Sequence, residues 1–151
     1  MSAAPFHLLL VEDELADALL FQDMLAEQDQ DITVHHVQNG QEALDHLAHP
    51  DRASRPHLIV LDLNMPIMNG HEFLERVKTL PEVRSIPVLV LSTSEHPSDI
   101  HRAYDQQVSG YVVKPGNYQE YMHVLETIRA YWRGLVRLPS LEEVLRGRVG
   151  S

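Results

Sequence analysis

Five short apolar runs constrain the fold of this chain more than any other feature of its sequence. They occupy residues 7–11, 32–37, 57–61, 88–91 and 111–113. Each is rich in Val, Ile and Leu and is continuous or nearly so, rather than alternating with polar residues. Strands that are buried on both faces have this pattern, because helices cover both sides of a parallel sheet. The sequence therefore predicts a parallel sheet.

Segments with a helical period lie between these runs and after the last one. Apolar side chains recur three to four residues apart in segments 17–28, 40–48, 70–80 and 97–104, and in a longer segment that reaches residue 135. Asn117 is a suitable N-cap for that last helix. The alternation predicts an α/β fold, a doubly wound five-stranded parallel sheet in the flavodoxin-like order 2-1-3-4-5 with a short C-terminal extension.

Length and composition favour one globular domain. A chain of 151 residues has the commonest domain size, and we expect a domain over residues 1–138 followed by a short tail over 139–151. The formal net charge of −10 argues against a nucleic-acid partner. We expect no membrane partner, because no apolar run has the length of a bilayer span. The absence of cysteine and of a signal-peptide pattern fits a cytoplasmic protein.

Polar residues follow four of the predicted strands. Glu12 and Asp13 follow the first, Asp62 the third, Ser92 the fourth and Lys114 the fifth. In the order 2-1-3-4-5 the first and third strands are neighbours, so Asp13 and Asp62 face each other across about 4.8 Å. Two carboxylates about 4 Å apart repel by about 4 kcal/mol at an effective dielectric constant of 20. A positive charge is therefore expected there.

A magnesium ion meets this requirement, since Mg²⁺ prefers oxygen ligands and leaves coordination positions for phosphate oxygens. Asp62 could then act as a nucleophile toward a phosphoryl group, while the metal and Lys114 neutralise charge on the oxygens in transfer. Ser92 offers a hydroxyl donor. Taken singly, Ser92 and Lys114 are also consistent with ordinary polar loop residues.

Four motifs in order resemble the receiver domains of bacterial two-component response regulators. They occupy residues 8–13, 61–66 together with Asn69-Gly70, 87–92 and 110–115. The resemblance runs from about His7 to Leu135. Two positions depart from the commonest pattern: the acidic pair is Glu-Asp instead of Asp-Asp, and Ser92 replaces the more frequent Thr.

The resemblance implies a phosphorelay protein that is not a conventional enzyme. Asp62 would accept a phosphoryl group from a histidine kinase and would assist its own phosphorylation and dephosphorylation. Asp13, Asp62 and the backbone carbonyl of Asn64 would bind Mg²⁺ directly, and Glu12 would act mostly through water.

The resemblance also implies roles for the ends of the last two strands. Ser92 and Lys114 would bind the phosphoryl oxygens, and the Lys114–Pro115 bond would be cis. Ser92 and Tyr111 would form the switch pair that moves on phosphorylation. Tyr111 is equally consistent with a half-buried core aromatic.

The end of the chain narrows the resemblance to one subgroup. Residues 131–139, and the insertion at residues 48–56, are similar to those of response regulators that partner bacterial phytochromes. Apolar residues of the last helix spread over two faces, which predicts a homodimer joined near Tyr131, Trp132 and Leu135. In the alternative, Trp132 covers the core of its own chain beneath the tail.

Three other functions share the predicted fold or part of the site. A haloacid dehalogenase phosphatase needs a second Asp where Asn64 stands, and a flavodoxin needs a phosphate loop where the acids 12–14 stand. The ten histidines are scattered, without carboxylate or Cys at metal spacing, so no histidine metal site is expected. The remaining alternative is a phosphorylation-independent interaction module on the same scaffold.

Overall fold

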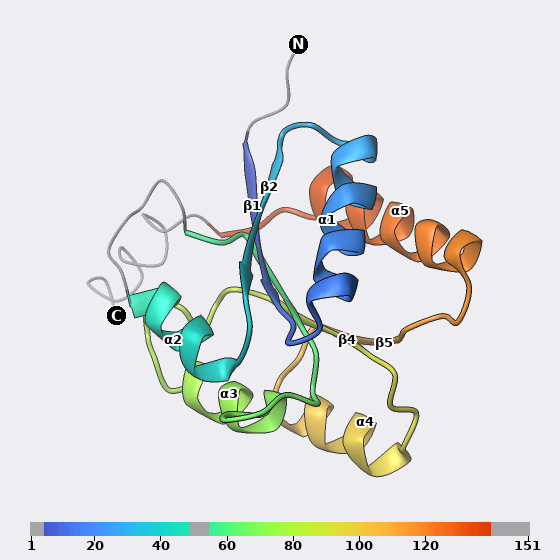
Figure 1. Ribbon diagram of the computed structural model, residues 1–151. Coiled ribbons are helices and arrows are strands. Elements are labelled where there is room, and N and C mark those ends of the chain that lie inside the picture. The colour runs from blue at the N-terminus through green and yellow to red at the C-terminus, as the bar shows by residue number, and fades with distance from the viewer. Residues whose placement is uncertain (1–4, 49–54, 140–151) are drawn as a thin grey trace.

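The computed structural model describes residues 5–48 and 55–139. Strands and helices alternate along the chain, as the hydrophobic pattern predicts (Figure 1). The elements are β1 (Phe6–Val11), α1 (Leu15–Gln28), β2 (Ile32–Val37), α2 (Gly40–Ala48), β3 (Leu58–Leu61), α3 (Gly70–Val77), β4 (Val88–Ser92), α4 (Pro97–Asp105), β5 (Gly110–Val113) and α5 (Tyr118–Gly134). The tail from residue 140 and most of the predicted insertion lie outside the described residues.

The sheet has the predicted topology. Its five strands are parallel and lie in the order β2-β1-β3-β4-β5, which confirms the fold class. In the β1–β3 pair Val11 lies opposite Leu61, and the Asp62 amide donates to the Val11 carbonyl at 3.0 Å. This register brings the residues that follow β1 and β3 to the same edge of the sheet.

Two hydrophobic clusters cover the two faces of the sheet. Helices α1 and α5 pack on one face, and α2, α3 and α4 on the other (Figure 1). Alternate residues of β1 belong to different clusters: Leu9 and Val11 contact the α2–α4 side, and Leu8 and Leu10 the α1/α5 side. Every residue of β3 and β4 is buried, which explains their continuous apolar runs.

Helix ends lie within two residues of the predicted segments except at the C-terminal end of α3. The Asn117 side chain accepts from the Glu120 amide, which confirms the predicted N-cap of α5. Helix α3 ends at Val77 instead of residue 80, because the chain then turns: the Leu80 amide donates to the Val77 carbonyl, and the Thr79 hydroxyl to the Arg76 carbonyl.

An ion pair joins the C-terminal end of α5 to the loop between α1 and β2. Arg133 Nε donates to Asp29 Oδ2 at 2.8 Å, and the guanidinium lies 5.6 Å from the centre of the Phe6 ring. Burial opposes ionisation of Asp29, but the contact with Arg133 lowers its carboxyl pKa. Trp132 packs half-buried on the α1/α5 cluster, whereas Leu135 remains 73% exposed.

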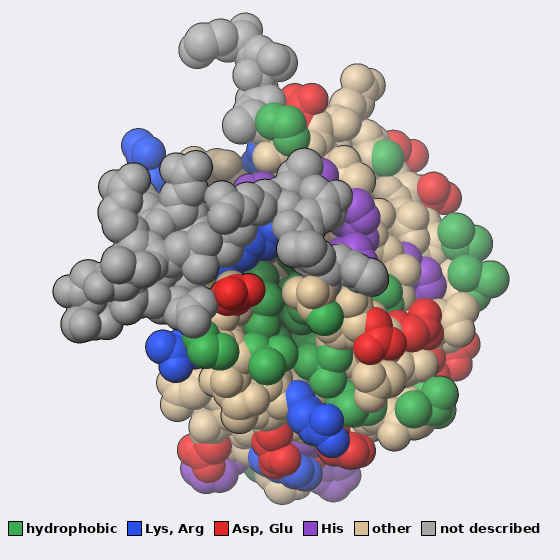
Figure 2. Space-filling model, turned by 90° about the vertical axis from the view of Figure 1, so that its left-hand side faces the viewer, with side chains coloured by type: hydrophobic (Ala, Val, Ile, Leu, Met, Phe, Trp, Pro, Cys, Tyr) green, Lys and Arg blue, Asp and Glu red, His purple; other side chains and the backbone are tan. Residues whose placement is uncertain are grey.

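Histidines that are distant in the sequence gather near the start of β1: His7 is its second residue, His57 directly precedes β3, and His35 is the fourth residue of β2. His7 Nδ1 lies 3.0 Å from His35 Nε2, and the backbone amide of His7 donates to His57 Nδ1 at 3.0 Å. The His46 ring of α2 lies 5.3 Å from that of His35. Figure 2 shows several histidine side chains (purple) near one another in the upper half of the view and others at its lower edge. The four residues form a histidine row (His7, His35, His46 and His57). The pairing of the strands brings together the members that lie on or beside them, and the spacing of the sequence does not.

The predicted cis bond before Pro115 is wrong, because the described residues contain no cis peptide bond. A bond that precedes proline prefers the trans form intrinsically, and the Lys114–Pro115 bond keeps it.

Among the described residues, no helix combines the length and the apolar character needed to cross a bilayer.

Candidate functional site

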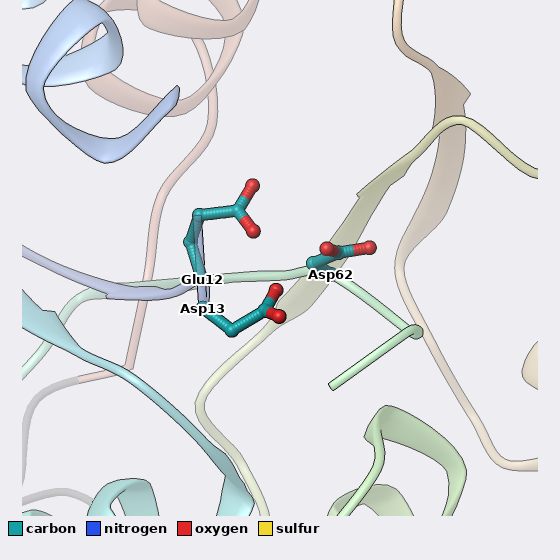
Figure 3. A group of neighbouring side chains, drawn as sticks. All are labelled: Glu12, Asp13 and Asp62. Carbon is teal, nitrogen blue, oxygen red and sulfur yellow. The ribbon is translucent and has the colours of Figure 1, made fainter. Parts of the chain in front are cut away.

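Three carboxylates converge at the carboxyl ends of β1 and β3. Oxygens of Glu12, Asp13 and Asp62 all lie within 4.8 Å of one another, and no other group of three acids, histidines or cysteines in the described residues does so. Figure 3 shows the carboxylates of Glu12 and Asp13 on the side that faces Asp62. Glu12 is buried, whereas Asp13 and Asp62 are partly exposed. The site is therefore a compact set of oxygen ligands that solvent can reach.

The crowding of the acids changes their ionisation. Burial raises the pKa of Glu12, although Lys114 opposes this change, and the nearby Asp62 raises it further. Burial and the contact with Glu12 also raise the pKa of Asp13. The ionised cluster is thus disfavoured until a cation neutralises it.

Lys114 supplies part of the neutralising charge. Its ammonium group pairs with Glu12 Oε1 and lies 3.5 Å from Asp17 Oδ2. Burial disfavours the charged lysine, but the bond to Glu12 and the charges of Glu12, Asp62 and Asp17 together raise its pKa. Since Lys114 binds Glu12 and Asp17, Asp13 and Asp62 are left facing each other.

The end of β4 places Ser92 deep in the structure, with a fully buried side chain. Its Oγ accepts from the Ser94 amide at 3.3 Å, which leaves the hydroxyl proton free to donate elsewhere. Tyr111 is half-buried against the α2–α4 cluster, and its hydroxyl donates to the Ser94 carbonyl at 2.8 Å. Both predicted switch residues therefore contact the same residue of the β4–α4 loop.

The loop after β3 is held close beneath Asp62. The Asn64 amide donates to Asp62 Oδ1 at 3.3 Å. Gly70 opens α3 against this loop, and its amide donates to the Leu63 carbonyl at 3.0 Å. A Cβ at Gly70 would lie 2.7 Å from Leu63 Cα and 2.9 Å from the Asp62 carbonyl oxygen. Only glycine allows this approach, so residue 70 fixes the backbone that carries Asp62.

Two contributors to the site were missed by the sequence analysis. Asp17 begins the helix-patterned segment 17–28, and its carboxylate lies 3.5 Å from the Lys114 ammonium because the first turn of a helix that follows Glu12-Asp13 lies near the strand end. His36 Nε2 bonds to the Glu12 carbonyl at 2.7 Å and supports the backbone of the acidic pair. In the structure His36 pairs with Leu10, two residues before Glu12, and the sequence predicts β1 and β2 as neighbours without defining this register.

The sequence matches the family described as "response regulator receiver domain" over residues 8–126. The chain belongs to this family. The receiver is 34% identical over 142 residues to "Response regulator Rcp1" of Synechocystis sp., which covers 92% of this chain and 97% of that protein.

Solved structures support the same assignment. The receiver superposes with a TM-score of 0.84 and 38% identity on the phosphorylated cyanobacterial phytochrome response regulator RcpA, covering 91% of this chain and all of that one. The Mn²⁺-bound form of Rcp1 gives a TM-score of 0.80 at 34% identity, over 90% of this chain and all of that one. The receiver is therefore similar to phytochrome response regulators, as the end of its sequence predicts.

Proposed function

We propose that the receiver accepts a phosphoryl group on Asp62 from a histidine kinase in the cytoplasm and then signals through protein contacts. The observation that supports this most directly is the carboxylate cluster with Lys114 beside it at the carboxyl edge of the sheet. Lys114 binds Glu12, and the partly exposed Asp62 remains accessible to a phosphodonor. RcpA, which is similar over nearly the whole chain, has been crystallised in a phosphorylated form.

In this proposal Mg²⁺ is held by Asp13, Asp62 and the carbonyl of Asn64, with Glu12 acting through water. The donors present are oxygens, which suits a hard cation, and their mutual repulsion favours one. Rcp1 has been crystallised with Mn²⁺, an ion that also accepts carboxylate ligands. The bound ion would neutralise negative charge on the oxygens of the transferring group.

The transfer itself needs few groups from the chain. A carboxylate oxygen of Asp62 forms a bond to phosphorus as the bond from phosphorus to the kinase histidine breaks, and that imidazole keeps the electron pair. Lys114 and Ser92 bind the phosphoryl oxygens, and Ser92 has a free hydroxyl proton for this purpose. Attack by water on the same phosphorus later returns Asp62 and inorganic phosphate.

The proposed kinase is a bacterial phytochrome, because the receiver is similar to RcpA over 91% of its length. The alternative, an interaction module that works without phosphorylation, would use the same fold but leave Asp62 unmodified.

Phosphorylation can be tested by intact-mass spectrometry after incubation with a small phosphodonor and Mg²⁺. Wild type should gain one phosphoryl group, Asp62→Asn none, and the exposed-acid control Asp45→Asn as much as wild type. Labelling of Asp62→Asn would show that another residue is the acceptor. A wild type that stays unlabelled, with small donors and with a phytochrome kinase, would favour the interaction module.

We also propose a homodimer that involves the end of α5. Tyr131 and Leu135 are 46% and 73% exposed, and the Tyr131 ring packs edge-on against Trp132 at 5.0 Å. Apolar side chains left on a helix surface are suited to an isologous contact. Trp132 packs on its own core as well, so Leu135→Ala is the cleaner variant.

Sedimentation equilibrium tests this assembly. Wild type should dimerise at micromolar concentration, and Leu135→Ala should weaken the dimer at least tenfold. A wild type that remains monomeric at high micromolar concentration would exclude it.

A further inference from the structure

Two histidines on neighbouring strands face each other through their ring nitrogens. His7 of β1 lies opposite Thr33 of β2, so His35, two residues further along β2, is on the same side of the sheet as His7. His7 Nδ1 and His35 Nε2 are 3.0 Å apart. Both residues are partly exposed, so an ion from solvent can reach the pair.

The separation of these two nitrogens suits a shared metal ion. Zn²⁺ binds histidine nitrogens at about 2.0–2.1 Å in tetrahedral geometry, which places two of them about 3.3 Å from each other. The observed 3.0 Å is close to that value. Without an ion, one imidazole donates its ring proton to the other. A neutral ring can move that proton to its other nitrogen, and both lone pairs are then available to one ion with no change in ring charge.

The pair differs from other histidines of the chain in its partners. His71 faces the Asp99 carboxylate at 3.4 Å, and His101 faces Asp105 at 3.3 Å. In the part of the chain that the structure describes, the rings of His7 and His35 have no acid as a hydrogen-bond or ion-pair partner. Their facing nitrogens are therefore not committed to a carboxylate. Burial also lowers the pKa of His35, which favours the neutral ring that binds metals.

We propose that His7 Nδ1 and His35 Nε2 bind one transition-metal ion of the Zn²⁺ class, and that the ion ties the edge strand β2 to β1. Imidazole suits Zn²⁺, Ni²⁺ and Cu²⁺, whereas Mg²⁺ and Ca²⁺ prefer oxygen ligands. The site thus differs in chemistry from the carboxylate cluster and does not rest on the proposed phosphorylation. The spacing of the histidines along the sequence predicts no such site, because the pairing of the strands creates it.

Two protein ligands make this an open site. Among the described residues, no third acid or histidine offers a ligand atom within 4.8 Å of both nitrogens. The nearby His46 ring lies 5.3 Å from that of His35, measured between ring centres. Water completes the coordination, so we expect a Kd in the micromolar range instead of the tighter binding of structural sites with four protein ligands.

Calorimetric titration with Zn²⁺ tests the site in the Asp13→Asn background, which weakens the carboxylate cluster as a competitor. This parent should bind one ion, and excess Mg²⁺ should leave the binding unchanged. His7→Gln and His35→Gln should each bind Zn²⁺ at least tenfold more weakly, because each removes one of two ligands. The matched control is His101→Gln, which alters an exposed His–Asp pair and should bind Zn²⁺ as the parent does.

A second measurement keeps both histidines in place. Tautomer-sensitive nitrogen NMR of the parent should show that Zn²⁺ shifts His7 Nδ1 and His35 Nε2 more than any other ring nitrogen. This result decides the test if a Gln variant fails to fold. The melting temperature of the parent should rise by about 5 °C when Zn²⁺ is in hundredfold excess over its Kd, and that of His35→Gln by less than half as much.

Several outcomes would overturn the proposal. They are the absence of Zn²⁺ binding, binding that neither Gln variant weakens, and NMR shifts confined to other histidines. A melting temperature that does not respond to Zn²⁺ would overturn the tie between β1 and β2. Labelling of Asp62 is measured separately, with both histidines intact, so this proposal and the proposed function can fail independently.

Discussion

The two ends of the parallel sheet both carry clusters of ionisable side chains, but the side chains at one end satisfy one another, whereas those at the other end repel. At the amino end the histidine row (His7, His35, His46 and His57) consists of rings in mutual contact, and Arg133 pairs with Asp29. At the carboxyl end Glu12, Asp13 and Asp62 carry the same charge, and Lys114 is the cation that the described residues place among them.

Under the proposed function, the amino-end cluster is structural and the carboxyl-end cluster serves binding and chemistry. Polar groups that satisfy one another contribute to stability, whereas like charges held together lower it. Acids with raised pKa values persist in a fold when the same arrangement serves binding or chemistry. Substitutions at the amino end should therefore destabilise the protein, and neutralisation of an acid at the carboxyl end should stabilise it.

The largest effect is expected from Arg133→Ala. It removes the ion-pair partner of Asp29, whose side chain is 14% exposed, so we expect a loss near the lower end of the about 3–5 kcal/mol that breaking a buried pair costs. Urea unfolding followed by circular dichroism measures the change. Arg102→Ala, in an exposed pair with Glu75, should change stability by less than about 1 kcal/mol. An equally small effect of Arg133→Ala would show that the amino-end pair is not structural.

A smaller effect of opposite sign is expected from Asp13→Asn. The pKa of Asp13 is raised, so its ionised form weakens the fold as the pH rises through that pKa. Neutralisation at pH 7.5 without metal should stabilise the protein by about 1 kcal/mol, a typical gain from removing an unfavourable charge.

In Mg²⁺ the order of stability of wild type and Asp13→Asn should then reverse. The melting temperature of wild type should rise with Mg²⁺ by mass action, and that of Asp13→Asn should not. A variant that is less stable than wild type in metal-free buffer, or that responds equally to Mg²⁺, would contradict the view that the acids await a cation.

The smallest effect concerns the histidine row under mild acid. Burial lowers the pKa of His35, and the neighbouring His46 and His7 lower it further. Burial also lowers the pKa of His57, with the charge of His7 acting in the same direction. The unfolded chain therefore binds more protons than the folded one. Stability that is complete above about pH 6.5 is lost as the pH falls from there toward the folded pKa.

Between pH 7.5 and pH 5.5 the melting temperature should fall by a few degrees less in His35→Gln than in wild type. His101→Gln, at an exposed position, should behave as wild type. Identical acid responses of His35→Gln and wild type would show that the row tolerates protonation.

The sequence predicted the carboxyl end of the sheet well and the amino end poorly, for a physical reason. Residues at the carboxyl end directly follow their strands, so knowledge of the strand order is enough to bring Asp13 and Asp62 together. His7, His35 and His57 meet because of the exact register of three strands, which apolar runs of this kind do not define. The contact of Asp99 with His71 depends on how α3 and α4 pack, and helix period alone does not specify that packing.

The close approach of Gly70 to the loop below Asp62 has a consequence for mutational tolerance. An added methyl group would meet main-chain atoms of Leu63 and Asp62, which cannot rotate aside as a flexible side chain would. In a saturation library selected for signalling, position 70 should therefore accept almost as few residues as position 62. Its neighbour Glu72, on the exposed face of α3, should accept many. The acceptor site would then depend as much on the absence of a Cβ at Gly70 as on the carboxylate of Asp62.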